Sequence, residues 1–589
     1  IDEPAQMLLI KNDPNYNEQW PRAVVPYKRI FGVDEPRKLD ALANNGKLSP
    51  YLPESTPFGL IGTSSLYKRE SYPQGAIPEG KVTATWLGKR HSGGYDALDP
   101  FNTSENGASL NWVNQGSDAG KYSNDDIHAI RILAMEPTTD RHRGFKEGRR
   151  FYSHAQERLR ILGEFPVRHF KDGKQPIDPD GNPDTSFLAK IPADTAFTFQ
   201  MLDKNGMLLT MAQTWHQVRP GEIRNDCGGC HAHSQKPTLF SRTAAAKPDY
   251  KVFDLTSATP LLTVKAKDQS GKQWDAGNQT GLRFEKTIKN VEFHRDIKPI
   301  LDRSCVACHT KNEANPPAKL VLDDDKKIPV SYLGQFAGSY FRLALDSEAK
   351  FGHKPVIHNG SWRQTNASRY IRKFQSRRSL LVWKIFGQRL DGWSNDDFPT
   401  EKVPGDAGTL MWKGKPIPNT SQNRNLADLD YIGPMCPPPH AKVPPLSDED
   451  KRTIVRWIDL GCPIDLDFDS ARPKERGYGW MLDDNRPVLT LTYPLANANE
   501  SLTRILVGMH DYDSGLDMRT FIVKADFPVD GTAAGENLAP RFRSVNPGVW
   551  EYRLKTPVMN LPAGTVTVSV RDRQGNRTQI VRTLRVERK

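Results

Sequence analysis

The chain has 589 residues, 37% of them hydrophobic, and a formal net charge of +12. At roughly 100–200 residues per domain this length predicts several domains, and the 45 prolines and 44 glycines favour a loop-rich globular fold. No apolar run approaches the ~18 residues that a membrane span requires, and the positive charge comes with no nucleic-acid-binding motif. A transmembrane segment and a nucleic-acid partner are therefore not expected.

Residues 1–150 predict an irregular, β-leaning region. They are rich in Pro, Gly, Ser and Asn, with short apolar pieces such as Phe58–Gly62 and Ile130–Leu133. Residues 151–284 predict a β-rich domain. Phe197–Leu202 has the pattern of a strand, Asn205-Gly206 is a two-residue hairpin signal, and Met207–Met211 would be the returning strand.

A Cys-x-x-Cys-His pattern occurs twice in the chain. The two copies are Cys227-Gly228-Gly229-Cys230-His231 and Cys305-Val306-Ala307-Cys308-His309. Two thiols at this spacing reach the two vinyl groups of one porphyrin and the adjacent imidazole ligates its iron, so each copy is the attachment pattern of a c-type haem. Paired zinc sites would need regular ligand pairs, which Cys436 and Cys462 do not supply. We therefore expect two covalently bound c haems, with His231 and His309 as iron ligands.

The haem prediction also implies a compartment. Cytochromes of the c type resemble one another in being assembled outside the cytoplasmic membrane, so we expect a periplasmic or extracellular protein. The chain begins at Ile1 rather than Met, which predicts a processed N-terminus whose signal peptide has been removed. In an oxidising compartment the remaining Cys436 and Cys462 form either a disulfide or two free thiols or a metal site, and the sequence leaves these alternatives open.

Residues 285–484 predict a mainly α, cytochrome c-like domain with a long insertion. Phe293, Ile297, Ile300 and Leu301 recur at helical spacing just before the second motif. Pro299 fits such a helix only in its first turn or at a kink.

A second helix is expected near the end of this domain. Ser447–Asp450 resembles a capping box, and Ile454, Trp457 and Ile458 continue it as an amphipathic helix. Two such helices cross beside the haem in small cytochromes. Within the insertion, the apolar stretch Ser379–Phe386 predicts a buried helix or strand.

Residues 485–589 predict an immunoglobulin-like β-sandwich, which completes a multidomain α+β chain. The valines of Val566–Val570 alternate, Asp572–Asn576 turns the chain, and the apolar residues up to Val586 share one face of the return. An acidic group around Gly515 suits an Asx-rich turn, with calcium binding as the alternative. Its members are Asp511, Asp513 and Asp517.

The second axial ligand of each haem decides its chemistry, because a six-coordinate haem exchanges electrons whereas an open position binds a small molecule. For the haem on His309 the best candidate is Met435, in a Pro-rich loop just before the capped helix. Class I cytochromes place their methionine there, but the cysteine that follows Met435 departs from that pattern. The rival ligands are His440, His353 and His358.

For the haem on His231 the sequence names no single partner. The upstream candidates are His91, His128, His154, His169 and His216. A tyrosine ligand and an open position are the alternatives, and the catalytic residues of an open site are unknown from sequence.

Several segments between Ile161 and His233 carry a family resemblance. They are Leu162–Glu164, Ile191–Asp194, Phe199–Asp203, Asn205–Met207, Val218–Glu222 and Cys227–His231. Together they resemble the middle domain of the hydrazine synthase α-subunit family, and Ile297–Leu301 and Arg456–Pro463 are similar more loosely. The resemblance implies an active-site haem in the middle domain and a second haem that relays electrons. The family's active haem takes a tyrosine four residues after the motif histidine, where this chain has Gln235.

Two functions follow from these predictions. The first is a dihaem c-type cytochrome that transfers electrons to redox partner proteins, such as other cytochromes, in a homo- or hetero-oligomeric complex. The second is a haem oxidoreductase with an open haem on His231, acting on a small nitrogen compound or peroxide, with the other haem as relay. Whether the chain is an enzyme stays open. The basic runs Arg141–Arg160 and Arg363–Arg378 predict solvated faces, with docking of an acidic partner as the alternative.

Overall fold

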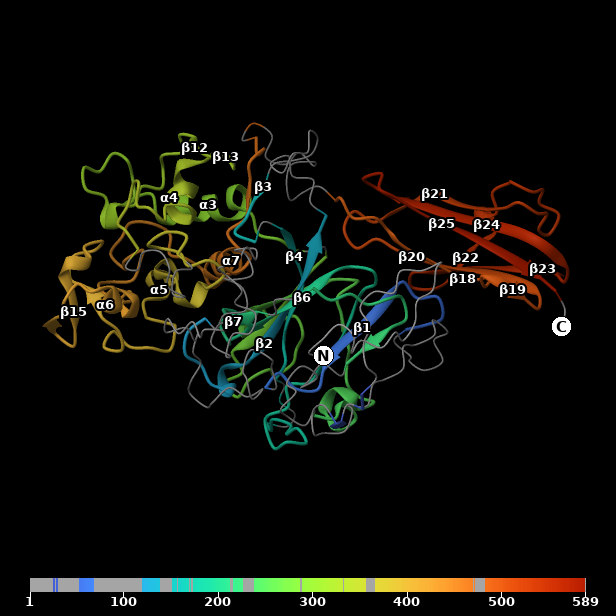
Figure 1. Ribbon diagram of the computed structural model, residues 1–589, viewed down its shortest axis with the longest axis horizontal. Coiled ribbons are helices and arrows are strands. Elements are labelled where there is room, and N and C mark those ends of the chain that lie inside the picture. The colour runs from blue at the N-terminus through green and yellow to red at the C-terminus, as the bar shows by residue number, and fades with distance from the viewer. Residues whose placement is uncertain are drawn as a thin grey trace, which may run out of the picture.

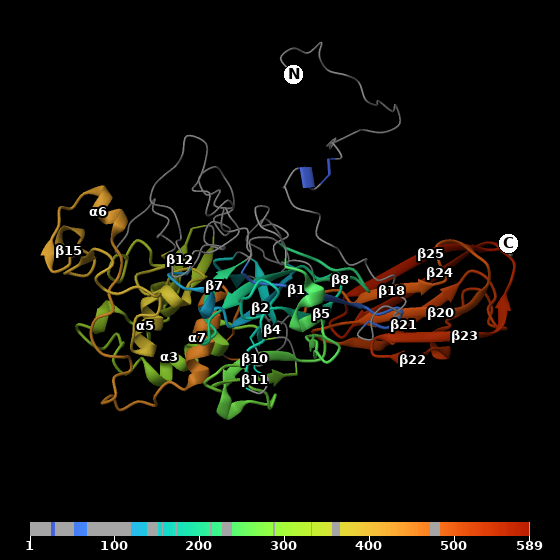
Figure 2. The ribbon, with the colours of Figure 1, turned by 90° about the horizontal axis from the view of Figure 1, so that it is seen from below.

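The computed structural model describes residues 25–26, 28–29, 52–67, 119–137, 151–155, 157–168, 170, 173–211, 215–225, 238–286, 289–331, 333–355, 366–469, 471 and 483–587. The fold is β-rich with few helices. Figures 1 and 2 show the helices α3 to α7 at one end, a group of strands in the middle and strands β18 to β25 at the other end. No helix of this described part combines the length and apolar character that a bilayer span needs.

The first central sheet is antiparallel and has the strand order β4-β2-β6-β7. Its strands are β4 (Arg158–Pro166), β2 (Ala129–Glu136), β6 (Phe197–Leu202) and β7 (Leu208–Met211). The predicted strand and its return are therefore confirmed. The connecting loop is longer than the predicted two-residue turn and covers residues 203–207. It is longer because Asp203 Oδ1 accepts hydrogen bonds from the backbone N–H groups of both Asn205 and Met207, at 2.8 and 3.0 Å.

The second central sheet has the strand order β8-β1-β5-β9. Its strands are β8 (Ile223–Arg224), β1 (Phe58–Thr63), β5 (Phe187–Pro192) and β9 (Phe253–Asp254). Side chains of both central sheets, such as Ile132 of β2 and Ile191 of β5, meet in one buried apolar cluster. Strands β1 and β2 precede residue 150, so the predicted β-leaning region contributes strands to the same layers as the segment that follows it. The domain limits themselves stay predictions.

Short strand pairs flank these sheets and the helices. They are β10 (Thr259–Val264) with β11 (Thr280–Glu285), β12 (Ile328–Val330) with β13 (Gly334–Phe336), β14 (Thr400–Glu401) with β15 (Leu410–Trp412) and β16 (Lys415–Pro416), and β3 (Phe151–Tyr152) with β17 (Ile464–Asp465). Pairing of β3 with β17 joins segments far apart in the chain. The helices are η7 (Phe293–Ile297, a π-helical turn), α3 (Lys298–Ser304), α4 (Gly338–Ala344), α5 (Leu380–Phe386), α6 (Ser421–Leu426) and α7 (Asp448–Asp459).

The helices that the sequence predicts are present in the structure, but the first of them is divided into two pieces. The segment before the second motif is helical in two pieces, η7 and then α3, and Pro299 lies in the first turn of α3 as expected. Helix α7 begins with a capping box: Ser447 Oγ accepts the N–H of Asp450 at 3.1 Å, and Asp450 Oδ2 accepts the N–H of Ser447 at 2.9 Å. The ambiguous stretch Ser379–Phe386 is a helix, α5, capped at its end by Gly387.

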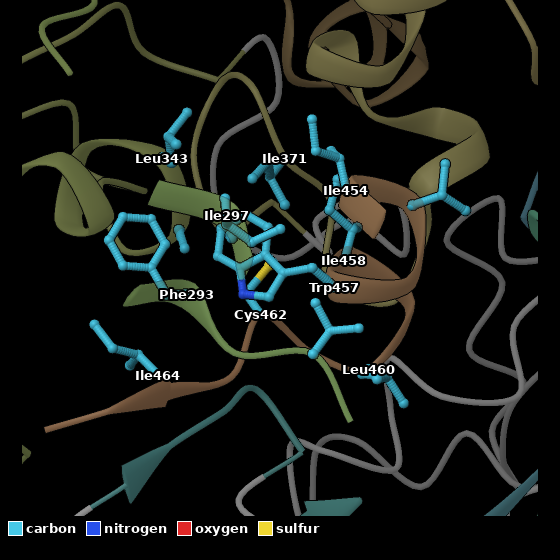
Figure 3. Close-up of a cluster of buried hydrophobic side chains, with 14 of the residues drawn as sticks. Phe293, Ile297, Leu343, Ile371, Ile454, Trp457, Ile458, Leu460, Cys462 and Ile464 are labelled. Carbon is cyan, nitrogen blue, oxygen red and sulfur yellow. The ribbon is translucent and has the colours of Figure 1, made fainter. Parts of the chain in front are cut away.

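One apolar core joins α7 to the helical segment before the second motif (Figure 3). The rings of Phe293 and Trp457 lie 5.7 Å apart between centroids, and Ile297, Ile458 and Cys462 are buried beside them. Burial of these side chains holds the start of the motif against α7.

The C-terminal strands form two four-stranded sheets, β18-β20-β23-β22 and β19-β25-β24-β21. The strands are β18 (Val488–Tyr493), β19 (Asn497–Asn499), β20 (Leu502–His510), β21 (Leu516–Ala525), β22 (Arg543–Asn546), β23 (Val549–Val558), β24 (Leu561–Asp572) and β25 (Arg577–Val586). Both sheets contribute to one buried apolar cluster, which contains Val566, Val568 and Val570 of β24. The predicted alternation on β24 and its return in β25 are confirmed.

The prediction that the basic runs are solvated faces is wrong for the arginines that the structure describes as buried. They are Arg158, Arg160, Arg372, Arg377 and Arg378. Arg372 and Arg378 both pair with the buried carboxylate of Asp428, and Arg160 pairs with Glu136 at 2.6 Å. Buried guanidinium groups need such partners because an unpaired charge is strongly disfavoured away from water.

Candidate functional site

The second cysteine motif forms a tight turn at the end of α3. The N–H of Cys305 still bonds to the carbonyl of Leu301 at 2.8 Å, so the helix carries the chain to the first cysteine. The N–H groups of Cys308 and His309 then both bond to the carbonyl of Cys305, at 3.2 and 3.1 Å. This turn keeps both thiols and the imidazole within one compact stretch of backbone, as attachment of one porphyrin requires.

The imidazole of His309 is held in a single tautomer. Its Nδ1 lies 3.1 Å from the carbonyl oxygen of Leu320, which only accepts, so Nδ1 carries the proton and donates. The Nε2 lone pair is then available to a metal, and a backbone carbonyl on the other ring nitrogen is the usual partner of a metal-ligating histidine. Burial lowers the pKa of His309, which favours the neutral imidazole that binds iron. These residues therefore fit a c-type haem.

The loop that carries Met435 is tied to helix α5. The N–H of Cys436 bonds to the carbonyl of Lys384 at 2.9 Å, and Lys384 Nζ donates to the carbonyls of Ile432 and Pro434 at 2.5 and 3.3 Å. Met435 folds over Gly387, where an added Cβ would lie 3.4 Å from the methionine sulfur. Glycine at this helix end thus leaves room for the side chain of Met435.

The same loop approaches the cysteine motif. Burial raises the pKa of Cys305 to about 12, and the neighbouring thiols of Cys436 and Cys308 add to the rise. The pKa of Cys436 is likewise raised by burial, with Cys308 contributing. The tertiary structure therefore brings the Met435 loop beside the motif, as the prediction of Met435 as axial ligand requires.

Of the three rival ligands, His440 and His353 lie in the described residues and His358 does not. His440 is exposed. His353 follows Gly352, which packs against the hydroxyl of Tyr370, and that hydroxyl donates to the carbonyl of Ala318 at 2.7 Å. His353 therefore borders the segment that supplies the hydrogen-bond acceptor of His309. His358 lies outside the described residues.

The two cysteines outside the motifs are both free thiols in the structure. Cys462 has no exposed surface and belongs to the core around Trp457, whereas Cys436 is half-buried beside the second motif. The alternative of a Cys436–Cys462 disulfide is therefore not formed, and the free-thiol alternative holds.

The first motif, Cys227, Cys230 and His231, lies outside the described residues, as do His91 and His169. The structure describes the strand that leads towards it. This strand, β8, occupies one edge of the second central sheet, where it pairs in parallel with β1.

The remaining candidate ligands for the first haem lie in three different places. His128 is buried just before β2, its Nε2 has no hydrogen-bond partner, and burial lowers its pKa to about 4. His154 Nε2 lies 2.8 Å from the carbonyl of Ala344 in the core near the helices. The His216 ring lies 5.8 Å from that of Phe197 on β6. The structure does not bring these three histidines together.

Sequence reasoning missed a buried polar network between the first central sheet and α7. Arg131 of β2 donates to Glu164 of β4 at 2.7 Å and to Gln200 of β6 at 2.7 Å. Gln200 Nε2 donates to the carbonyl of Asp459 at 2.8 Å, and Arg456 also binds Glu164. Only the pairing of distant segments creates these contacts, although Glu164 and Arg456 both lie in the segments that carry the family resemblance.

Comparison with known proteins gives matches of two kinds. Residues 125–232 match the family described as the hydrazine synthase alpha subunit middle domain. The chain is 25% identical over 382 residues to hydrazine synthase subunit alpha of Kuenenia stuttgartiensis, an alignment that covers 59% of this chain and 39% of that protein. The chain thus spans about two fifths of the length of this relative.

Two solved structures overlap with parts of the chain. Kuenenia stuttgartiensis hydrazine synthase has a TM-score of 0.36 at 16% identity, covering 70% of this chain and 43% of that one. Dimeric latent PorU from Porphyromonas gingivalis has a TM-score of 0.14 at 18% identity, covering 18% and 10% of the two chains. The sequence matches therefore show that residues 125–232 are similar to the middle domain of the hydrazine synthase α-subunit family, and that the chain is hydrazine synthase α-subunit-like.

Proposed function

We propose that this chain is a periplasmic or extracellular dihaem c-type cytochrome that transfers electrons within a larger complex. The single observation that carries the proposal is the His309 imidazole, whose Nδ1–H is donated to the Leu320 carbonyl at 3.1 Å beside a Cys-x-x-Cys turn. A bound c haem supplies one-electron redox chemistry. The residues that would hold the two haems are Cys227, Cys230, His231, Cys305, Cys308, His309 and Met435.

Met435 is the proposed second axial ligand of the haem on His309. Its loop is tied to α5 through Lys384 and lies next to the motif thiols. A haem held by both His309 and Met435 would supply one-electron redox chemistry and would leave no position for a substrate. We assign residues 285–484 to a cytochrome c-like domain and residues 485–589 to an immunoglobulin-like sandwich.

The test counts haems on matched variants. Intact mass and the pyridine haemochrome spectrum of the purified protein should give two haems. The double variants C305S/C308S and C227S/C230S should each lose one haem, whereas C436S, which removes a thiol beside the motif but outside it, should keep both. A wild-type protein without haem, or double variants that keep both haems, would refute the proposal.

A second function is favoured by the match of residues 125–232 to the hydrazine synthase alpha subunit middle domain. Here the haem on His231 is open and acts on a small nitrogen compound or peroxide, with the His309 haem as relay. Electron paramagnetic resonance of the oxidised protein separates the two functions. Two low-spin signals support the carrier, whereas a high-spin signal that cyanide converts to low-spin, retained in C305S/C308S, supports the enzyme.

A larger complex is part of the proposal because the aligned relative is named as a subunit of an enzyme. Redox partners would dock on the part of the chain that presents the second haem. Size-exclusion chromatography with light scattering on protein from its native source measures the assembly directly. A mass equal to one chain with its haems would contradict this part of the proposal.

A further inference from the structure

Three buried carboxylates converge at one end of the C-terminal sandwich. They belong to Asp483, Asp511 and Asp572, and one oxygen of each lies within 4.8 Å of an oxygen of the other two. Asp511 directly follows β20 of one sheet, Asp572 ends β24 of the other, and Asp483 lies on the segment that enters β18. The three residues are only 3%, 8% and 2% exposed, in the order Asp483, Asp511 and Asp572.

Uncharged donors orient each carboxylate without neutralising it. Asp511 Oδ2 accepts the N–H groups of Gly515 and Asp513 at 2.5 and 3.2 Å, and Asp483 Oδ2 accepts the N–H of Ser514 at 3.0 Å. Asp572 Oδ1 accepts the backbone N–H of Asn576 at 2.8 Å and Oδ2 its side-chain amide at 2.7 Å. These bonds tie three segments of chain around one point, and all of the donors are uncharged.

Two oxygens at this point have no partner. Asp511 Oδ1 and Ser514 Oγ are both buried and make no hydrogen bond. A carboxylate oxygen buried without a donor is strongly disfavoured unless a cation or water binds it. The unpartnered Asp511 oxygen is therefore an observation independent of the acidic cluster, and it points to a missing positive charge.

Basic side chains of the described residues do not supply that charge. In the described part of the chain, no ion pair involves Asp483, Asp511 or Asp572. Two arginines of this region pair with neighbouring acids instead: Arg160 pairs with Asp513 at 2.9 Å, and Arg158 pairs with Asp484.

We propose that Asp483, Asp511 and Asp572 form a calcium site, with the Ser514 hydroxyl as a further oxygen ligand. Ligands bound at about 2.4 Å to one calcium ion lie up to about 4.8 Å apart, which matches the separation of the three carboxylate oxygens. The ligand set contains only oxygen, which excludes the sites typical of zinc or copper. Ligands from three separate segments suit the flexible coordination of calcium better than the strict octahedron of magnesium.

The site lies where the sandwich meets the first central sheet. Between its ligand residues, Tyr512 donates its hydroxyl to Glu136 of β2 at 3.0 Å, and Asn485, two residues after Asp483, donates to the same carboxylate at 2.7 Å. Calcium at this point fixes the loop that makes these contacts. We therefore expect bound calcium to stabilise the contact between the sandwich and the sheet that contains β2 and β4.

The test treats the full-length holoprotein with a chelator and then titrates it with calcium. Calorimetry measures the binding, and thermal unfolding measures the gain in stability. Wild type should bind calcium with a Kd below about 1 mM and gain thermal stability, whereas magnesium at the same concentration should have little effect. D511N, which keeps the backbone contacts but loses a charge, should lose at least tenfold in affinity. D517N, at the start of β21 just after the loop and on a half-buried residue paired with Arg519, should bind as wild type does.

The wild-type titration decides the proposal even if D511N fails to fold. No calcium binding by wild type up to about 10 mM, a concentration above the range of extracellular calcium sites, overturns it. So does equal stabilisation by magnesium, or equal loss of affinity in D511N and D517N. None of these outcomes depends on the haem proposal, because the readout is calcium binding to the sandwich.

Discussion

Arg456 of α7 donates two hydrogen bonds to the carboxylate of Glu164 of β4, from Nε to Oε1 at 3.0 Å and from Nη2 to Oε2 at 2.9 Å. Both side chains are almost fully buried. Arg131 binds the same carboxylate from β2 at 2.7 Å. One carboxylate thus joins the first central sheet to the helix that packs beside the second haem motif, so this contact fixes how the two parts sit together.

Loss of the Glu164 charge should destabilise this junction strongly. In E164Q two buried guanidinium groups lose their shared counter-charge, and breaking a buried pair of this kind costs about 3–5 kcal/mol. Chemical unfolding followed by tryptophan fluorescence measures the loss. The matched control is E449Q, because Glu449 binds the same Arg456 at 3.1 Å but is partly exposed, and it should cost about 0–1 kcal/mol. Equal losses in both variants would contradict the assigned role of Glu164.

The same pair makes stability depend on pH in the acid range. Burial alone would raise the pKa of Glu164, but Arg456 and Arg131 outweigh it and lower the pKa to about 2, from an ordinary value of 4.5. A carboxylate with a lowered folded-state pKa stabilises the fold above its ordinary pKa, and this stability disappears as the pH falls from about 4.5 to about 2. The stability difference between wild type and E164Q should therefore shrink across this window. A difference that stays constant down to pH 2 would refute the linkage.

Thiol labelling tests both haem attachment and the state of the two other cysteines. The chain has six cysteines, and four of them would be in thioether bonds to haem. Alkylation of the unfolded, unreduced protein should therefore modify Cys436 and Cys462 alone, because neither forms a disulfide. In the native protein Cys462, which has no exposed surface, should stay unmodified while half-buried Cys436 reacts. Peptide mass mapping reads both results, and labelling of any motif cysteine would show an unattached haem.

Substitution of Met435 should change the haem on His309 in two ways. M435H replaces a thioether by an imidazole and should lower the reduction potential of that haem, since methionine ligation raises it. M435A should leave an open position that binds cyanide. Spectroelectrochemistry and cyanide titration measure these effects, and H440A, on an exposed rival, should match wild type in both. A spectrum altered in H440A but not in M435A would move the ligand assignment to His440.

Local patterns predicted most of the regular elements. The strand Phe197–Leu202, the capping box at Ser447, the proline in the first turn of α3 and the alternating valines of β24 all follow from residues within a few positions of one another. Local steric and hydrogen-bonding rules decide such features. The loop at residues 203–207 differed because the side chain of Asp203 offered the backbone an alternative to the short turn.

The candidate haem site was predictable in part. The spacing of Cys305, Cys308 and His309 predicts the attachment residues, but the carbonyl that orients the imidazole belongs to Leu320, in a segment without any pattern. The approach of the Met435 loop depends on Lys384, on a different helix. These partners depend on how the chain returns to the motif, which spacing does not encode.

The sequence by itself determined the positions of the two haem motifs and the local elements around them, because both depend on neighbouring residues. Only the tertiary structure decided which charged side chains are buried and which groups lie beside them. Arginines that looked like solvated runs are buried against Glu136 and Asp428, and three distant aspartates share one buried point. The reason is physical: a buried charge is stable only with a partner, and the topology of the sheets decides which distant residue that partner is.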